Sequence, residues 1–243
     1  MKPLIGVTAV WSTEMGLCGM TDEFDYVGCS YTQALLKAGG IPVLMPPPKD
    51  TETDLDAYAD EILNRLDGVY FSGGGSVGKR VSRGPLPLYE QQPVRSRWED
   101  ILLKKAYALD MPILGACRGH QMITEALGGA LHKEFFPVHR QTNPRHKGHH
   151  MVQITPGSLL GSIVGEEDWF VNSLHTQKTE ITPTGLIVSA RTESGDVEAI
   201  ESTEKTFVIG TQFHPEMMIY DPRAEKVLQA YIAAAKAYNE KKK

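Results

Sequence analysis

Cys117 lies in a segment whose glycine spacing is typical of a nucleophilic turn. The apolar run 111–114 leads into Gly-Ala-Cys-Arg-Gly at 115–119, and a helix-like segment follows it. A strand, a sharp turn and a helix in this order expose a reactive side chain at the end of a sheet. Glycines at 115 and 119 have no Cβ to clash in such a turn, and a helix N-terminus favours a thiolate. The alternative is a buried core cysteine, but the flanking glycines favour a nucleophile.

His214 and Glu216 have the residue types and the spacing to activate that thiolate. They follow a predicted strand, in Gln-Phe-His-Pro-Glu at 212–216. Side chains two apart point to the same side of an extended segment. We therefore expect Glu216 to hold one ring nitrogen of His214 while the other ring nitrogen faces Cys117. Taken alone, the motif also fits a loop histidine that meets a carboxylate by chance. Together with the Cys117 turn, the order of nucleophile, base and orienting group predicts a catalytic triad.

Acyl transfer through a thioester also needs N–H donors for the tetrahedral oxyanion. The backbone N–H of Arg118, directly after the nucleophile, is the first expected donor. The glycine run 73–75 is the expected source of the second, because glycine can turn an N–H toward a closely bound ligand. A flexible turn and a phosphate-binding loop are the alternatives for this run. The phosphate loop ranks last, because Val-Gly-Lys-Arg at 77–80 lacks the Gly-Lys-Ser/Thr that it requires.

Strands and helices alternate through the first half of the chain, up to the Cys117 turn. Expected strands are Leu4–Thr8, Ile41–Met45 and Gly68–Phe71, and expected helices are Asp25–Lys37, Thr53–Leu66 and Arg95–Leu109, with a loop at Ser76–Pro93. This alternation predicts an α/β fold with a doubly wound, mostly parallel sheet. Sites in such sheets form at the carboxyl ends of the strands, where Cys117 and the glycine run 73–75 both lie.

The second half is richer in strands, which predicts an antiparallel extension of the same sheet. The expected strands are Ala130–Phe135, Met151–Ile154, Phe170–Val171, Leu186–Ala190, Val197–Glu201 and Phe207–Phe213, and the expected helices are Ser158–Val164 and Asp221–Tyr238. We find no repeat, linker or shift in composition. The sequence therefore predicts a single domain over residues 1–243.

Composition limits the partners and the compartment. A net charge of −5 argues against nucleic acid or a membrane surface as the main partner. The three cysteines, Cys18, Cys29 and Cys117, predict neither a disulfide framework nor a zinc site. No signal peptide is recognisable, and no apolar run is long enough to span a membrane. We expect a cytoplasmic protein with a small-molecule substrate, and the sequence is compatible with a homodimer.

Other polar residues are weaker candidates for catalytic or binding roles. The histidine-rich segment 146–150 suggests a metal, but no carboxylate or cysteine lies close to it in sequence, so a polar loop is favoured and no metal is expected. By its residue type alone, His175 is expected to be a structural, hydrogen-bonded histidine. Lys79, Arg80, Arg83 and Arg95 could meet a substrate carboxylate, although a solvated loop face is the default expectation.

These motifs resemble the class I glutamine amidotransferase superfamily. More narrowly, the chain is similar to its branch of gamma-glutamyl hydrolases, typified by gamma-glutamyl-gamma-aminobutyrate hydrolase. The similarity runs nearly end to end and rests on Ala38-Gly39-Gly40-Ile41-Pro42, Asp67-Gly68, Ser72-Gly73-Gly74, Cys117-Arg118-Gly119-x-Gln121, Gly128-Gly129, Val171-Asn172-Ser173-Leu174-His175, Glu198-Ala199-Ile200 and Gly210-Thr211-Gln212-Phe213-His214-Pro215-Glu216. Arg118 after the nucleophile is typical of the hydrolase branch.

The resemblance implies a flavodoxin-like fold and a site built from specific residues of this chain. It implies Cys117, His214 and Glu216 as the triad, and the N–H groups of Gly74 and Arg118 as the oxyanion hole. It also places Gly73, Gln121 and His175 at the substrate, and it implies no metal or organic cofactor. The chain departs from the branch at Ser76, Lys79 and Ser96, where the branch usually has Asp, Pro and Asp. The sequence therefore does not name the amine that leaves.

Three functions remain open at this point. The favoured one is a hydrolase that cleaves the gamma-glutamyl amide of a small gamma-glutamyl-amine through a glutamyl thioester. The second is a glutaminase subunit that supplies ammonia to a separate synthase chain. The third is a redox or non-catalytic role for Cys117, which leaves the His-Pro-Glu motif unexplained.

Overall fold

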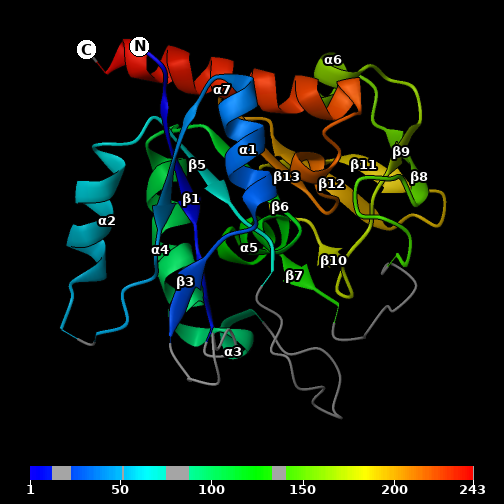
Figure 1. Cartoon of the computed structure of the whole chain (residues 1–243). Coiled ribbons are helices and arrows are strands. Elements are labelled where there is room, and N and C mark those ends of the chain that lie inside the picture. The colour runs from blue at the N-terminus through cyan, green and yellow to red at the C-terminus, as the bar shows by residue number, and fades with distance from the viewer. Residues whose placement is uncertain (13–22, 51, 75–87, 133–140, 243) are drawn as a thin grey trace.

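A nine-stranded sheet forms the centre of the computed structural model, which describes residues 1–12, 23–50, 52–74, 88–132 and 141–242 (Figure 1). The strands lie in the order β4-β1-β5-β6-β13-β12-β11-β8-β9. Their bounds are β1 Leu4–Thr8, β4 Ile41–Met45, β5 Gly68–Phe71, β6 Ile113–Ala116, β8 His150–Ile154, β9 Trp169–Val171, β11 Leu186–Thr192, β12 Val197–Ser202 and β13 Val208–Thr211. Two small sheets pair β2 (Val10–Ser12) with β3 (Phe24–Tyr26) and β7 (Ala130–Leu131) with β10 (Thr179–Ile181).

The large sheet has a parallel half and an antiparallel half. β4, β1, β5, β6 and β13 pair in parallel, and β12, β11, β8 and β9 continue the sheet in antiparallel pairs. This is the predicted doubly wound sheet with an antiparallel extension, so the expected fold class is confirmed. β13 is the junction, because it pairs in parallel with β6 on one side and antiparallel with β12 on the other.

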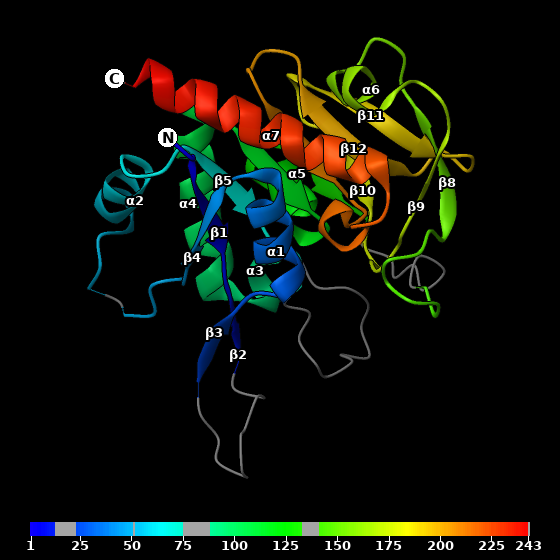
Figure 2. The same ribbon diagram turned by 45° about the horizontal axis from the view of Figure 1, so that its top comes forward.

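Helices cover both faces of the sheet (Figures 1 and 2). Their bounds are α1 Cys29–Ala38, α2 Leu55–Leu63, α3 Leu88–Gln91, α4 Pro93–Ala108, α5 Arg118–Ala126, α6 Leu159–Val164 and α7 Pro222–Lys241, with a 3₁₀ turn, η2, at Pro215–Met217. α1, α6 and α7 pack into one hydrophobic core, and α2, α4 and α5 pack into a second core across the sheet. The central strands β5, β6 and β13 are buried along their whole length, as expected for strands with helices on both faces.

Capping and periodicity explain several of these helices. Buried residues of α7 recur at helical spacing, at Ala224, Val227, Leu228, Tyr231, Ile232 and Ala235, so one stripe faces the core. Asp221 caps this helix by accepting from the N–H of Arg223, and Ser158 caps α6 in the same way through Gly161. The sequence predicted both helices, with these caps counted as their first residues.

The structure corrects two sequence predictions near the site. Asp25 and Tyr26, expected to begin a helix, lie in strand β3 because this segment pairs with β2, and Gly28 delays α1 to Cys29. The expected loop at 76–93 contains α3, and α4 begins at Pro93, a residue that fits the first turn of a helix. Residues 75–87 of that loop lie outside the described part of the chain. Within the described ranges, no helix is long and apolar enough to cross a bilayer.

The burial of β6 predicts how much the strand before Cys117 contributes to stability. Leu114 is fully buried in β6, so Leu114→Ala should lower the free energy of unfolding by about 2–5 kcal/mol through lost burial and a cavity. Leu36→Ala, at a leucine on α1 that is 50% exposed, should change it by less than about 0.5 kcal/mol. Urea denaturation followed by circular dichroism measures both, and equal effects would contradict the packing described for β6.

Candidate active site

Three neighbouring parallel strands deliver the predicted site residues to one edge of the sheet. Ser72, Gly73 and Gly74 follow β5, Cys117 follows β6, and His214 lies three residues after the end of β13. The pairings Phe71↔Gly115 and Thr211↔Ala116 fix the relative heights of these strand ends. Cys117, His214 and the glycine loop therefore meet where ligands bind in open α/β sheets.

The backbone of Cys117 is held in an unusual conformation by close packing. Its φ of 54° and ψ of −104° place it outside the regions that L-residues ordinarily adopt. A Cβ on Gly115 would lie 2.6 Å from the carbonyl carbon of Gly119, and a Cβ on Gly119 would lie 2.0 Å from the Phe71 oxygen. The two glycines thus let α5 start directly against β5 and β6. Cys117 caps that helix, and its side chain is partly exposed.

His214 is bound to Glu216 as the motif predicted. His214 Nδ1 lies 2.7 Å from Glu216 Oε1, and both side chains are buried. His214 Cε1 and Cys117 Cβ would lie 2.9 Å and 3.2 Å from a Cβ on Gly73, so both side chains pack against this glycine. Because Nδ1 is bonded to Glu216, Nε2 is the ring nitrogen left to face the thiol. Burial alone lowers the pKa of His214, but the charges of Glu216 and Cys117 outweigh it and raise that pKa to about 10. The imidazole is therefore held as an imidazolium at neutral pH.

The expected reason for the His214–Glu216 contact was wrong, although the contact is present. Residues 215–217 form the 3₁₀ turn η2 and are not extended. Pro215 starts this turn, and the turn brings Glu216 back toward the ring of the preceding histidine. Asn172 holds the His214 backbone on both sides: its Oδ1 accepts from the His214 N–H at 2.7 Å, and its Nδ2 donates to the His214 carbonyl at 3.1 Å.

Two buried tyrosines complete the surroundings of the triad and were not singled out from the sequence. The Tyr70 hydroxyl donates to Glu216 Oε2 at 3.0 Å, so both oxygens of that carboxylate are engaged. The Tyr31 hydroxyl accepts from the Gly73 N–H at 2.7 Å and lies 3.4 Å from His214 Nδ1. Burial and then the Glu216 charge raise the pKa of each phenol well above its usual value, so both stay protonated.

Gly73 lies directly against the reactive groups. A Cβ placed there would be 2.9 Å from His214 Cε1, 2.9 Å from the Tyr31 oxygen and 3.2 Å from Cys117 Cβ. Its N–H is already bonded to Tyr31. Gly74 follows with a φ of +81° and is exposed, and the role of its N–H as the second oxyanion donor stays a prediction. Gly75, the third glycine of the run, lies outside the described residues.

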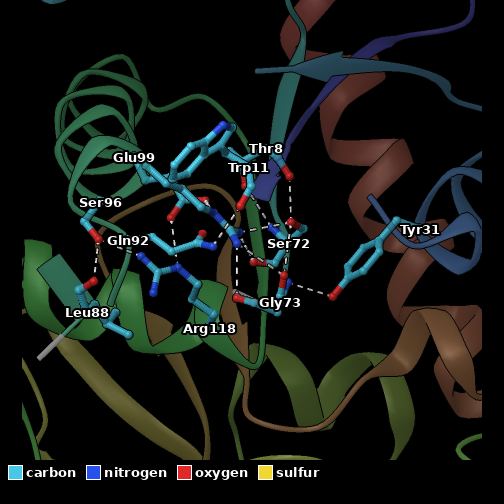
Figure 3. A network of polar contacts seen from close by, with 12 residues as sticks. Thr8, Trp11, Tyr31, Ser72, Gly73, Leu88, Gln92, Ser96, Glu99 and Arg118 are labelled. Carbon is cyan, nitrogen blue, oxygen red and sulfur yellow. Dashed lines mark hydrogen bonds and ion pairs between the residues drawn. The ribbon is translucent and has the colours of Figure 1, made fainter. Parts of the chain in front are cut away.

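Arg95 holds the carbonyl groups of this glycine loop. In Figure 3, Tyr31 lies on one side of Ser72 and Gly73, and Glu99, the carboxylate partner of Arg95, lies on the other. Its guanidinium donates to the Ser72 carbonyl at 2.7 Å and to the Gly74 carbonyl at 3.1 Å, and its Nε donates to Glu99 at 2.7 Å. Arg95 and Glu99 are each 1% exposed. The expectation that Arg95 belongs to a solvated loop face is therefore wrong, because α4 carries it inward to the Ser72–Gly74 carbonyls.

The side chain of Arg118 joins the same network. Arg118 Nη2 donates to Ser96 Oγ at 2.7 Å, and Arg118 Nε lies 3.4 Å from Glu99 Oε2. Ser96 Oγ in turn donates to the Leu88 carbonyl at 2.6 Å. Burial and the neighbouring Arg95 lower the pKa of Arg118 to about 10, so it stays charged near neutral pH. Two buried arginines share the carboxylate of Glu99, and the charge of Glu125 also acts on Arg118.

Gln121 and His175, placed at the substrate by resemblance, both make internal contacts. Gln121 Nε2 donates to the Gln177 carbonyl at 3.1 Å and to Gln212 Oε1 at 3.2 Å. His175 is buried, with Nδ1 2.9 Å from the Gln177 carbonyl and Nε2 3.4 Å from Glu198 Oε1. These two side chains tie the segment at 177 to α5 and β12. Their contact with a substrate stays a prediction.

Glu198 is a fully buried carboxylate between two histidines. His150 Nε2 and His175 Nε2 each lie 3.4 Å from its Oε1. Burial alone raises the pKa of Glu198, but these histidines lower it to about 2. Among the residues that the structure describes, no cluster of three His, Cys, Asp or Glu side chains has the arrangement of a metal site, the histidine-rich segment 146–150 included. Cys18, Ser76, Lys79, Arg80 and Arg83 lie outside the described ranges.

The fold is shared with glutaminase domains of class I glutamine amidotransferases. A solved structure titled "Trypanosoma brucei CTPS - glutaminase domain with bound acivicin" superimposes with a TM-score of 0.66 at 18% identity, covering 97% of this chain and 94% of that one. This likeness defines the fold class, and it agrees with the parallel and antiparallel halves of the sheet.

Within that class, the model of the family Peptidase C26 matches residues 3–216, and the chain belongs to this family. Gamma-glutamyl-gamma-aminobutyrate hydrolase PuuD of Escherichia coli K12 is 30% identical over 88% of this chain and 86% of its own length. A Mycobacterium tuberculosis protein named "Putative glutamine amidotransferase Rv2859c" is 32% identical over 98% of this chain and 76% of its own length.

The position of Gly73 predicts that a single methyl group would disable the site. In Gly73→Ala the new Cβ would overlap His214, Tyr31 and Cys117. We expect turnover to slow by about 10²-fold or more, because small displacements of catalytic groups have effects of this size. Gly28→Ala is the control, because a Cβ there meets nothing closer than 3.6 Å. Alkylation of Cys117 by iodoacetamide, followed by peptide mass spectrometry, reports the site directly. An unchanged alkylation rate together with unchanged turnover in Gly73→Ala would contradict this geometry.

The Glu216 contact predicts the titration of His214. The pKa rises from 6.5 to about 10 on folding, so protonated His214 stabilises the native state fully below pH 6.5, and this stabilisation is lost as the pH rises toward 10. Glu216→Gln removes the main charge that raises this pKa and should move the titration toward neutral pH. An NMR titration of the His214 ring measures both proteins. The same midpoint in Glu216→Gln and in the unmodified chain would exclude Glu216 as the cause.

Proposed function

We propose that this protein is a hydrolase that cleaves the gamma-glutamyl amide bond of a small gamma-glutamyl-amine through a thioester on Cys117. The observation that carries this proposal is that Cys117 and a His214 ring held by Glu216 pack against the same glycine, Gly73. The family and the E. coli relative named as a gamma-glutamyl-gamma-aminobutyrate hydrolase support the substrate class. The amine that leaves is not part of the proposal.

The first half-reaction forms the thioester. The Cys117 thiolate attacks the side-chain carbonyl carbon of the glutamyl group, a C–S bond forms, and the carbonyl π pair moves onto oxygen. The N–H groups of Gly74 and Arg118 bind this oxyanion. When the tetrahedral intermediate collapses, the C–N bond breaks and His214 gives its Nε2 proton to the departing amine. The imidazolium that Glu216 favours is the protonation state that this step needs.

The second half-reaction releases glutamate. Neutral His214 now takes a proton from water, and the hydroxide oxygen attacks the thioester carbonyl. The new oxyanion uses the same two N–H donors. Its collapse breaks the C–S bond, restores the thiolate and returns the site to the thiolate–imidazolium pair. Glu216 keeps the His214 ring in one orientation through both steps, as the orienting carboxylate of a triad does.

A glutaminase subunit that passes ammonia to a separate synthase chain is the alternative. The M. tuberculosis relative carries an amidotransferase name, and the same thioester chemistry would release ammonia from glutamine. The two functions differ in what the isolated chain does. A hydrolase turns over substituted gamma-glutamyl amides by itself, whereas a partner-dependent glutaminase shows little activity alone.

Glutamate release by the purified chain tests the proposal. The unmodified protein should release glutamate from gamma-glutamyl amides of several amines, and Cys117→Ala should lower the rate by about 10⁴-fold or more. Cys29→Ala is the matched control, because Cys29 is an exposed free cysteine at the start of α1, and it should leave the rate unchanged.

Two results would contradict the proposal. Activity that survives in Cys117→Ala would exclude this nucleophile. Release from glutamine that exceeds release from every substituted amide would favour the glutaminase. A reaction quenched during turnover should carry the glutamyl group on the peptide that contains Cys117, and a glutamyl group found on another residue would refute the mechanism.

A further inference from the structure

The peptide unit between Ser72 and Gly73 is held at both of its polar ends. Arg95 Nη2 donates to the Ser72 carbonyl at 2.7 Å. At the other end, the Gly73 N–H donates to the Tyr31 hydroxyl at 2.7 Å (Figure 3). The C=O and N–H of a trans peptide point in opposite directions within one plane. Arg95 and Tyr31 therefore lie at opposite edges of this peptide unit, and together they fix its rotation.

The next peptide unit takes its orientation from the same arginine. Arg95 Nη1 faces the Gly73 carbonyl at 3.5 Å and the Gly74 carbonyl at 3.1 Å. The Gly73 carbonyl and the Gly74 N–H belong to one planar unit, so the Gly74 N–H points away from the guanidinium. Gly74 is exposed at a φ of +81°, a conformation that glycine adopts without strain. Nothing in these contacts occupies its N–H.

The positive charge of Arg95 strengthens its hydrogen bonds to the glycine loop. Arg95 is buried, and Glu99, its carboxylate partner, also faces Arg118 at 3.4 Å. One carboxylate therefore serves two guanidinium groups, and the backbone carbonyls of the glycine loop satisfy the remaining donors of Arg95. Hydrogen bonds from an ionised donor are stronger than those between neutral groups. Releasing the loop would leave a buried guanidinium with unpaired N–H groups, which costs free energy.

We propose that Arg95 and Tyr31 are positioning residues that hold the Gly74 N–H in the direction of an oxyanion donor, so that the site is assembled within a single chain. This inference rests on the proposed function for its catalytic consequence. Neither side chain contacts the reacting atoms in this role, because both act through the backbone of Ser72–Gly74. A loop fixed inside the chain needs no partner protein to turn its N–H groups toward the substrate.

Tyr31 also lies near the triad. The test must therefore distinguish an effect of Tyr31 on the Gly73 backbone from an effect on His214. Its hydroxyl is 3.4 Å from His214 Nδ1, compared with 2.7 Å to the Gly73 nitrogen, and His214 Nδ1 is already bonded to Glu216 at 2.7 Å. The shorter contact assigns Tyr31 to the loop. Alkylation by iodoacetamide needs the thiolate and no oxyanion hole, whereas amide hydrolysis needs both. A variant that loses only the hole should therefore lose hydrolysis and keep alkylation.

Tyr31→Phe and Arg95→Lys test the proposal in the full-length protein. Loss of one oxyanion donor lowers kcat by about 10²–10³-fold. We therefore expect kcat to fall by about 10-fold or more in Tyr31→Phe and by about 10²-fold in Arg95→Lys. KM should stay within about threefold of the unmodified value in both variants. Controls are Tyr231→Phe, at a buried tyrosine whose hydroxyl has no hydrogen-bond partner among the described residues, and Arg97→Lys, at an exposed arginine of α4. Both controls should keep the unmodified rate.

The alkylation rate of Cys117 should stay within about threefold of the unmodified protein in both variants, since the thiolate–imidazolium pair is intact. Equal losses of alkylation and hydrolysis would overturn the proposal, because the side chains would then act through the triad. Unchanged hydrolysis in both variants would overturn it as well. A raised KM with normal kcat would show a role in substrate binding and would also contradict positioning of the oxyanion donor.

Amide hydrogen exchange gives a readout that does not depend on any substrate. With ¹⁵N-labelled glycine, the Gly73 N–H should exchange slowly in the unmodified protein and at least about tenfold faster in Tyr31→Phe, because its acceptor is gone. An unchanged exchange rate of the Gly73 N–H would show that Tyr31 does not fix this peptide unit. The unmodified chain could hydrolyse no gamma-glutamyl amide while the Gly73 exchange rate changes as expected. That result would contradict the proposed function and would still support the role of Tyr31 in fixing the Gly73 backbone.

Discussion

The conformation of Cys117 is the constraint on which the rest of the site depends. A φ of 54° at a residue with a side chain is unfavourable in isolation, so the surrounding structure must enforce it. β6 ends one residue before, α5 begins one residue after, and Gly119 lies so close to Phe71 that no other residue type fits there. The same tight junction puts Cys117 at the N-terminus of a helix beside the end of β13. The strained backbone of Cys117 and its position near His214 therefore follow from one local geometry.

Much of this arrangement was predictable from the sequence, because it is encoded in neighbouring residues. The Gly-x-Cys-x-Gly turn, the His-Pro-Glu motif and the alternation of strands and helices are all short-range patterns, and the fold class followed from them. The turn at Pro215 was not predictable in detail, since a dipeptide containing proline fits both an extended segment and a 3₁₀ turn. Gly74 and the Gly73 loop could be named as an oxyanion region, but the sequence did not indicate which N–H is free.

The contacts that could not be predicted join residues far apart in the chain. Tyr31 on α1, Tyr70 on β5 and Asn172 after β9 all act on the segment 214–216 or on Gly73. Arg95 looked like a loop cation because it follows a stretch rich in proline, and only its position on the inner side of α4 makes it a buried partner of the glycine loop. Single-sequence patterns report which face of an element is apolar. They do not report which buried polar groups will meet across the sheet.

The pairing of β6 with β13 determines when Cys117 and His214 can come together during synthesis. Gly115 and Thr211, which meet at this pairing, are 96 residues apart in the chain. Long-range pairings of this kind form late, because a large loop must close first. The nascent polypeptide thus carries Cys117 for a long interval before His214 can reach it. If Cys117 is the nucleophile proposed above, its activation by His214 must wait until β13 docks beside β6.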